Sequence, residues 1–577
     1  MSGPDDLDRA LRALLARIYP GADAEALSRQ AVEAFWPGGR QPCPAPRAAD
    51  GAGWSERDAI LITYGNSIQD GVHKPLDLLH DFLLEHLEGA ITGVHILPFF
   101  PYTSDDGFAV TDFTAVDPAL GDWPDIERIG GTHRLMSDLV LNHVSSQGVW
   151  FNAYRQGQAP YDKFFFEAAP EDDLSMVVRP RTTPLLQQVE TANGPRHVWC
   201  TFSHDQIDLN FANPDVLIEM LRIIRLHLDR GVQVIRLDAV AFIWKVIGTP
   251  SIHMPQTHAI IQLIRLMCDW AEEPVLLITE TNVPKAENLS YFGQSNEAHA
   301  IYNFPLPPLI LQALMSGSAA YLRAWSAAMP PAPMGCAYFN FTASHDGIGM
   351  RPVEGLLPDA EKDRMFDALG RAGALFSMRT GPDGQDAVYE VNCSYFAALS
   401  CTYDGPDPWQ FERFLASQTI VMSLEGIPGL FIHSMLATPN DVDAVERRGM
   451  NRAINRHRWD YPSLQAHLAD PGSVHARVLD ALRRRLALRG RQKAFHPNAT
   501  QFTLPLEPRL FGLWRQSIDR WQSIFAVHNV SAETVHLDPI ALNLIADEPW
   551  VDLLTGEAVG EEIVFAPYQC RWITNRA

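Results

Sequence analysis

The strongest constraint on the fold of this 577-residue chain is a repeated alternation of short apolar runs with stretches of helical apolar spacing. Such alternation is typical of parallel βα units, in which each helix returns the chain to the start of the next strand. Eight runs have the length and composition of strands: 59–64, 93–99, 134–144, 232–240, 274–281, 300–304, 338–346 and 426–433. Eight parallel strands close into a (β/α)8 TIM barrel, so we predict functional side chains at the carboxyl ends of these strands.

Further parts of the chain surround this barrel. Residues 1–55 combine a predicted helical hairpin, over 7–36, with a Pro- and Gly-rich linker over 37–54. The barrel spans 56–490 and carries two inserts that are too long for ordinary βα loops, 145–205 after the third strand and 350–400 after the seventh. Alternating short strands over 495–577 indicate a C-terminal antiparallel β domain. The predicted class is an α/β barrel with two insert subdomains and a C-terminal β domain.

Composition excludes several classes of function. The formal net charge of -23 argues against a nucleic-acid partner, because such a partner requires a basic face. No apolar run reaches the length of a membrane span, and the N-terminus lacks the apolar core of a signal peptide. The seven Cys are scattered without a CxxC pair, which favours a reduced, cytoplasmic protein without a zinc site. Residues 1–55 would either pack on the barrel or form a homodimer contact, and we favour packing.

Polar side chains follow the predicted strands at the ends that should face one mouth of the barrel. These side chains are Asp138, Asn142, His143, Arg236, Asp238, Glu280, His345 and Asp346. Three carboxylates that share a pocket oppose one another's ionisation and raise at least one pKa. A retaining glycosidic mechanism uses such an arrangement, since one carboxylate attacks as nucleophile while another, about 5 Å away, keeps its proton and serves as acid and then base.

Four of these segments carry a resemblance to a known family. DLVLNH, IRLDAV, ITETN and SHDG resemble, in order, the four signature regions of the α-amylase superfamily of glycoside hydrolases and transglycosylases. The resemblance implies that Asp238 is the nucleophile, Glu280 the general acid/base and Asp346 the carboxylate that stabilises the transition state. It further implies that Arg236 orients Asp238 and that His143 and His345 bind sugar hydroxyls. Starch-acting members bind calcium through an Asn that matches Asn142, but one Asn does not make a calcium site, so we predict no required metal.

Longer stretches of the chain resemble sucrose phosphorylase and its relatives. They are LITYGNSIQDG, GVHILPFFPYTSDDGF, RPR, RLDAVAFIWKVIGT, ASHDGIGMRP, YEVN and NRAINRH. This resemblance implies cleavage of an α-glucoside by inorganic phosphate, as co-substrate and without another cofactor, to α-glucose 1-phosphate. By the same resemblance Asp105 and Arg456 would clamp glucose hydroxyls and Phe108 would form a wall for the sugar. Phosphate would bind to the RPR arginines, whose guanidinium forks match phosphate oxygens, with Tyr389 opposite; of Arg179 and Arg181 we favour Arg181.

Two departures from sucrose phosphorylases fall on the acceptor side. Asn282 stands where those enzymes carry a His, and Glu390 stands where they carry a Gln. The ETNVP…ENLSYFG stretch, the ASHDGIGMRP form and the N-terminal helices most resemble glucosylglycerate phosphorylases, followed by sucrose 6'-phosphate phosphorylases. Both have anionic acceptors, for which the RPR arginines or Lys285 would supply a cation.

The predicted reaction is the reversible phosphorolysis of 2-O-α-D-glucosylglycerate to α-D-glucose 1-phosphate and D-glycerate. It would proceed by double displacement through a β-glucosyl-Asp238 intermediate. The open alternatives are a sucrose 6'-phosphate or sucrose phosphorylase, and an α-glucoside hydrolase or transglucosylase.

Overall fold

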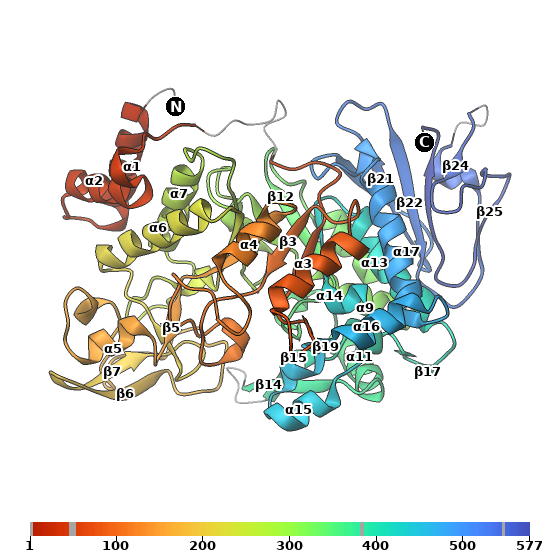
Figure 1. The fold of residues 1–577 in the computed structure, drawn as a ribbon. Helices are drawn as coiled ribbons and strands as arrows, with labels where there is room; N and C mark the ends of the chain where they lie inside the picture. The colour runs from red at the N-terminus through yellow and green to blue at the C-terminus, as the bar shows by residue number, and fades with distance from the viewer. Residues whose placement is uncertain (1–3, 45–52, 381–385, 545–547, 577) are drawn as a thin grey trace.

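The central element of the molecule is a closed barrel of eight parallel strands (Figure 1). The computed structural model describes residues 4–44, 53–380, 386–544 and 548–576. The barrel strands are β1 (Ile60–Thr63), β3 (Gly93–Ile96), β4 (Arg134–Val140), β9 (Val232–Asp238), β10 (Leu276–Thr279), β11 (Ala300–Tyr302), β12 (Ala337–Phe341) and β18 (Ile427–Phe431). Each lies within or across one of the eight predicted runs, and the predicted (β/α)8 fold is confirmed.

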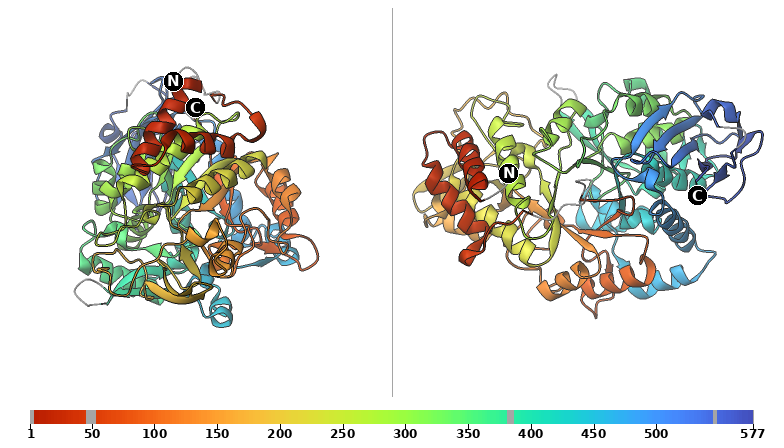
Figure 2. Two further views of the ribbon diagram at one scale, coloured as in Figure 1. Left: turned by 90° about the vertical axis from the view of Figure 1, so that its left-hand side faces the viewer. Right: turned by 90° about the horizontal axis from the view of Figure 1, so that it is seen from above.

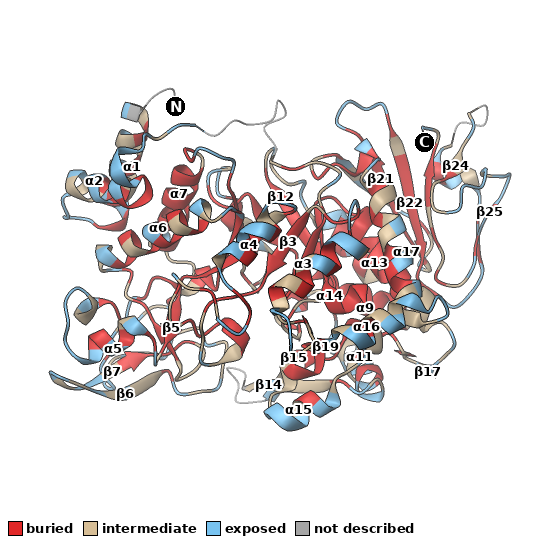
Figure 3. Cartoon of the chain, viewed as in Figure 1, coloured by how far each residue is buried: buried red, intermediate tan, exposed pale blue. Residues whose placement is uncertain are grey.

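The barrel strands are buried on both faces, which explains their nearly continuous apolar sequences (Figure 3). In β9 only Gln233 is exposed. Arg236 and Asp238 are buried at the carboxyl half of the same strand. Charged groups are rarely buried unless they are paired, so their position marks this end of the barrel as a polar mouth.

Helices surround the strands in the order that the sequence pattern predicts. The main covering helices are α3 (Pro75–His86), α4 (Trp123–Gly130), α6 (Pro214–Asp229), α7 (Pro255–Cys268), α9 (Leu306–Ser316), α13 (Gln410–Ser423) and α17 (Val474–Arg489), with the shorter α8 (Lys285–Leu289), α10 (Ala320–Ala328), α14 (Ile432–Met435), α15 (Val442–Arg448) and α16 (Tyr461–Ala469). Helix α6 begins with Pro214, and the side chain of Asn213 accepts from the N–H of Asp215. These are the residues expected at a helix start.

Both inserts begin at carboxyl ends of barrel strands. The first contains β5 (His143–Ser145), α5 (Val149–Arg155), β6 (Leu186–Thr191), β7 (Gly194–Trp199) and β8 (Gln206–Asp208). The second contains β13 (Ile348–Gly349), α11 (Asp359–Arg371), β14 (Leu375–Thr380), β15 (Asp386–Asn392), α12 (Tyr395–Ala398), β16 (Cys401–Thr402) and β17 (Gly405–Pro406). In the second insert β13, β15 and β14 form one antiparallel sheet, and residues 381–385 lie outside the described residues.

The two ends of the chain pack on opposite sides of the barrel (Figures 1 and 2). Helix α1 (Pro4–Ile18) contacts α7 and helix α2 (Ala24–Phe35) contacts α6, where Phe35 is fully buried and the hydroxyl of Tyr19 donates to the carbonyl of Phe211 at 3.1 Å. Residues 45–52 of the predicted linker lie outside the described residues.

At the other end, β20 (Thr500–Leu504), β21 (Leu510–Gln516), β22 (Ser523–Asn529), β26 (Cys570–Thr574) and β24 (Val551–Asp552) form an antiparallel sheet, and β23 (Val535–Leu537) pairs with β25 (Ile563–Phe565). Arg515 and Trp572 of the larger sheet donate to Ser423 at the end of α13, at 2.9 Å to its carbonyl and 2.8 Å to its hydroxyl. These contacts join the C-terminal sheet to the barrel. None of the described helices is long and apolar enough to cross a membrane.

A buried lysine anchors the first insert to the barrel. The ammonium of Lys245 lies 2.7 Å from Oδ1 of Asn142 and 2.9 Å from Oδ2 of Asp208, and all three residues are buried. Asp208 also accepts from the N–H and the hydroxyl of Thr201, at 2.9 and 2.6 Å. Burial lowers the pKa of Lys245, and the carboxylate of Asp208 opposes this effect. Because Asn142 precedes His143, this ion pair fixes the backbone that carries a predicted sugar-binding residue.

We therefore predict that Lys245→Met lowers the stability of the protein. The substitution leaves the Asp208 carboxylate buried without its cation, a change that costs about 3 kcal/mol or more. Thermal melting followed by circular dichroism measures the effect, with Lys163→Met, an exposed lysine of the same insert, as the matched control. Equal melting temperatures for the two variants would show that the ion pair does not anchor the insert.

Candidate active site

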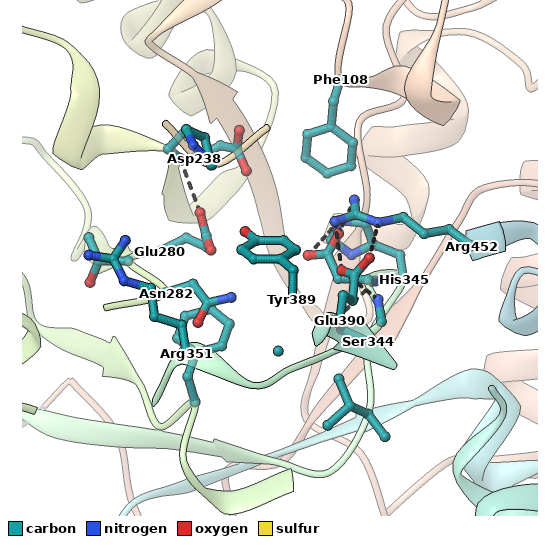
Figure 4. A pocket seen from close by; sticks show the side chains of 18 of the residues that line it. Phe108, Asp238, Glu280, Asn282, Ser344, His345, Arg351, Tyr389, Glu390 and Arg452 are labelled. Carbon is teal, nitrogen blue, oxygen red and sulfur yellow. Dashed lines mark hydrogen bonds and ion pairs between the residues drawn. The ribbon is translucent and has the colours of Figure 1, made fainter. Parts of the chain in front are cut away.

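A pocket at the carboxyl end of the barrel collects residues from both inserts and from the segment after α15 (Figure 4). Twelve of the residues predicted from the sequence line it: Asp105, Phe108, His143, Arg181, Arg236, Asp238, Glu280, Asn282, His345, Asp346, Tyr389 and Glu390. The other two take different positions. Arg456 lies behind the pocket wall, where its Nε donates to the carbonyl of His345 at 2.8 Å, and Arg179 is exposed beside the pocket.

Arg236 is the electrostatic centre of the pocket. Its NH1 donates to Oδ1 of Asp238 at 2.6 Å and also to Asp138, while its NH2 lies 3.9 Å from Oε2 of Glu280. Asp138 is completely buried and in turn contacts Nε2 of His95 at 2.6 Å. Burial opposes the ionisation of Asp138, but its interactions with Arg236 and His95 outweigh this effect and lower the pKa of Asp138 to about 2.

Asp238 and Glu280 form a coupled pair of carboxyl groups. Burial raises the pKa of both, and repulsion between the two carboxylates raises that of Asp238 further. Two such neighbours share one proton over a wide pH range. The shorter contact of Asp238 with Arg236 favours an ionised Asp238 and leaves the proton on Glu280. One carboxylate is thus prepared to attack and the other to donate a proton, as double displacement requires.

The backbone between these two groups is strained. Ala239 adopts a φ of 49°, in the left-handed region that non-glycine residues rarely occupy. In this conformation its N–H donates to Oε2 of Glu280 at 3.2 Å. The strained conformation of Ala239 thus allows a hydrogen bond between the end of β9 and Glu280, the general acid predicted at the end of β10.

Asp346 has an arginine of its own, which the sequence analysis did not assign. NH1 of Arg452 contacts Oδ1 of Asp346 at 2.5 Å, and its Nε and NH2 donate to the two oxygens of Glu390 at 3.1 and 2.8 Å. Burial alone would raise the pKa of Asp346, but Arg452 and further positive neighbours outweigh it and hold the pKa far below its usual range. Asp346 therefore remains ionised while Glu280 keeps its proton.

Glu390 lines the pocket, and its carboxylate is also held by the protein. Both its oxygens accept from Arg452, and Oε1 also accepts from the N–H of Gly347 at 3.1 Å. A Cβ on Gly347 would come within 2.4 Å of Cγ of Glu390, so this close approach requires glycine. Glu390 positions Arg452; whether it also touches an acceptor stays a prediction.

Aromatic rings and histidines form the opposite half of the pocket. The rings of Phe108 and His345 stack with centroids 4.7 Å apart and planes 7° apart. Burial lowers the pKa of His345 to about 3, and burial also lowers that of His143. Both imidazoles are therefore neutral near pH 7, the state in which one ring nitrogen donates and the other accepts. This arrangement fits an uncharged polyol such as a hexose.

Arg456 was predicted to act together with Asp105, but in the structure its guanidinium lies closer to Asp106. NH1 of Arg456 lies 3.5 Å from Oδ1 of Asp105 but only 2.7 Å from Oδ2 of Asp106. Asp106 also pairs with Arg448. Asp106 is thus the nearer carboxylate partner of Arg456, while Asp105 lines the pocket.

Arg181 and Arg351 line the pocket, and neither guanidinium has a carboxylate partner among the described residues. The guanidinium of Arg181 lies 5.5 Å from the centre of the Tyr389 ring, and within the described part of the chain it makes no hydrogen bond or ion pair. Lys285 is half-buried, donates to the carbonyl of Ala328 at 3.3 Å and does not line the pocket. Arg351 is a further lining residue that the sequence analysis did not single out, although it lies in the quoted ASHDGIGMRP stretch.

No group of three or more His, Cys, Asp or Glu side chains is arranged for a metal ion within the described ranges. The Asn142 amide oxygen instead contacts the ammonium of Lys245.

Known proteins resemble the chain along most of its length. A family model described as the α-amylase catalytic domain matches residues 70–331. A glucosylglycerate phosphorylase of Spirochaeta thermophila is 44% identical over 530 residues, which are 91% of this chain and 90% of that protein. A glucosylglycerate phosphorylase of Escherichia coli is 38% identical, with 90% and 92% covered. A sucrose phosphorylase of Bifidobacterium adolescentis is 28% identical, with 71% and 82% covered.

A solved structure shares the fold. A sucrose 6F-phosphate phosphorylase from Thermoanaerobacter thermosaccharolyticum superposes with a TM-score of 0.73 at 23% identity, over 88% of this chain and 98% of that one.

The carboxylate roles can be separated with α-D-glucosyl fluoride, whose leaving group needs no proton. Asp238→Asn should lower fluoride release by about four orders of magnitude, because no nucleophile remains. Glu280→Gln should still release a burst of about one fluoride per site, since only the second, base-assisted step is lost. Rapid-mixing fluoride measurements, with circular dichroism as the control for folding, test both variants. Near-normal fluoride release by Asp238→Asn would show that Asp238 is not the nucleophile.

Proposed function

Because the chain belongs to the phosphorylase group of the α-amylase superfamily, whose members are glycosyltransferase-type enzymes, we propose that it cleaves 2-O-α-D-glucosylglycerate with inorganic phosphate. The products are α-D-glucose 1-phosphate and D-glycerate, and the reaction is reversible. The observation that carries the proposal is an unpaired guanidinium, that of Arg181, in a pocket with three carboxylates. Water as acceptor needs no cation there, whereas phosphate does.

The first displacement transfers glucose to the enzyme. The carboxylate of Asp238 attacks the anomeric carbon, and the bond from that carbon to the glycerate oxygen breaks. Glu280 donates its proton to the departing oxygen, so that glycerate leaves with its hydroxyl restored and Glu280 becomes a carboxylate. Positive charge that develops on the sugar ring is stabilised by ionised Asp346.

The second displacement returns the enzyme to its starting state. After glycerate has left, phosphate enters the pocket at Arg181, and Glu280 removes a proton from the attacking phosphate oxygen. That oxygen bonds to the anomeric carbon and the ester to Asp238 breaks, which gives the α-phosphate with retained configuration. Arg181 would hold the phosphate through its planar fork, which accounts for an arginine rather than a lysine here.

The proposal is tested by incubation of the purified protein with phosphate and one glucoside at a time. The glucosides are glucosylglycerate, sucrose and sucrose 6'-phosphate, and the assay separates glucose 1-phosphate from free glucose. We expect glucose 1-phosphate from glucosylglycerate. Glucose 1-phosphate formed only from another glucoside would show that the acceptor is not glycerate. Free glucose formed at an equal rate without phosphate would show that the protein is a hydrolase.

The phosphate assignment has its own test. Arg181→Ala should raise the KM for phosphate by about 10- to 100-fold, because a charge-assisted contact with the anion is lost. The KM for the glucoside should change much less. Arg181→Lys serves as the matched variant, since it keeps the charge but not the fork. Equal increases for both substrates in Arg181→Ala would count against phosphate binding by this residue.

A further inference from the structure

Arg351 brings a second unassigned cation to the pocket. It follows β13 at the start of the second insert and lines the pocket together with Glu280 and Asn282. In Figure 4, Arg351 and Asn282 lie on the side of Glu280, whereas Arg452 and His345 lie on the other side. The side of the pocket that receives the leaving group is the side that carries the general acid. Arg351 is therefore placed to act on the leaving group.

Its guanidinium is not used by the protein itself. Arg236 and Arg452 each pair with at least two carboxylates, but the guanidinium of Arg351 makes no hydrogen bond or ion pair with any residue that the structure describes. The side chain is only partly exposed. A guanidinium held without a partner at the wall of a pocket is a receptor for an anion.

Asn282 supplies a second polar group that lacks a partner. Its Oδ1 is buried and accepts no hydrogen bond within the described part of the chain. The amide is packed against Gly349, where a Cβ would come within 2.7 Å of Nδ2. The absence of a side chain at Gly349 therefore makes room for the amide of Asn282. An unpaired buried oxygen is costly unless a ligand satisfies it.

The chemistry of the leaving group narrows the identity of the anion. In a glucoside of a 2-hydroxycarboxylate, the carboxylate carbon is bonded to the carbon that carries the glycosidic oxygen. Its charge must then lie beside the oxygen that Glu280 protonates. In a fructose 6-phosphate glucoside, by contrast, the phosphate is several bonds from that oxygen. A cation on the side of Glu280 matches the first class.

From these observations we propose that Arg351 and Asn282 form the binding site for a 2-hydroxycarboxylate leaving group. Arg351 binds the carboxylate, and the amide oxygen of Asn282 accepts from the terminal hydroxyl of glycerate. This inference rests on the proposed phosphorylase function and specifies the acceptor subsite. It also assigns different ligands to the two arginines: Arg181 binds phosphate, and Arg351 binds the organic acid.

The experiment runs the reaction in the direction of synthesis, with α-D-glucose 1-phosphate as donor. The acceptors are D-glycerate, D-lactate, which lacks the terminal hydroxyl, and glycerol, which lacks the carboxylate. Arg351→Gln should raise the KM for D-glycerate and D-lactate by about 10- to 100-fold and leave transfer to glycerol unchanged. Asn282→Ala should raise the KM for D-glycerate but not for D-lactate. Arg351→Lys should restore part of the affinity for both acids.

Two controls make the assignment specific. With α-D-glucosyl fluoride as donor, which has no organic acid to recognise, Arg351→Gln should keep the wild-type KM for phosphate. Lys285→Gln removes a neighbouring positive charge outside the pocket and tests the other cation predicted from the sequence.

The inference is overturned if Arg351→Gln weakens glycerol and glycerate equally, if it raises the KM for phosphate as much as that for glycerate, or if Lys285→Gln alone weakens glycerate. Wild-type protein that transfers no glucose to D-glycerate would instead overturn the proposed function, and this inference with it. Wild-type transfer to D-glycerate with an unaffected Arg351→Gln would overturn this inference alone.

Discussion

The interaction on which the active pocket depends is the contact of Arg236 with the carboxylates around it. Four charged side chains meet at the carboxyl ends of β4, β9 and β10, and Arg236 is only 2% exposed. Without this guanidinium, Asp138, Asp238 and Glu280 would be three mutually repelling groups in a medium of low dielectric constant. With it, Asp138 and Asp238 are neutralised by direct contact, and Glu280, at a longer distance, is the group that retains a proton. The distances to one arginine thus set two different protonation states.

Arg452 repeats this principle at Asp346. It binds the carboxylate of Asp346 and that of Glu390, so one guanidinium is shared by two acids. Glu390 also accepts from the backbone of Gly347, and it comes from β15 of the second insert. The second insert therefore acts on the reaction centre through Glu390 and Arg452, in addition to forming a wall of the pocket. A Gln at this position would leave Arg452 with less negative charge to balance.

The fold was predictable from the sequence because each barrel strand is a short, nearly continuous apolar run between helical patterns. The predicted strand ends extended too far at β4 and β12, where polar residues such as His143 and His345 lie beyond the barrel strands and line the pocket. Arg452 was not predicted, because sequence spacing does not reveal that a residue more than one hundred positions away meets Asp346. The choice between Asp105 and Asp106 for Arg456 was equally hidden, since both adopt left-handed φ values of 51° and 49° that place their side chains differently.

The segment that carries Arg452 and Arg456 comes late in the chain, after all eight barrel strands. Asp346, Glu390 and the carbonyl of His345 take an arginine partner from this segment, and Asp106 takes one of its arginine partners from it. During synthesis on the ribosome, which proceeds from the N-terminus, the carboxylates are thus complete long before their arginines emerge. In a chain that ends before this segment, Asp346 and Glu390 would lack the guanidinium of Arg452 that pairs with both of them. The ion pairs of the pocket are therefore complete only in the nearly full-length chain.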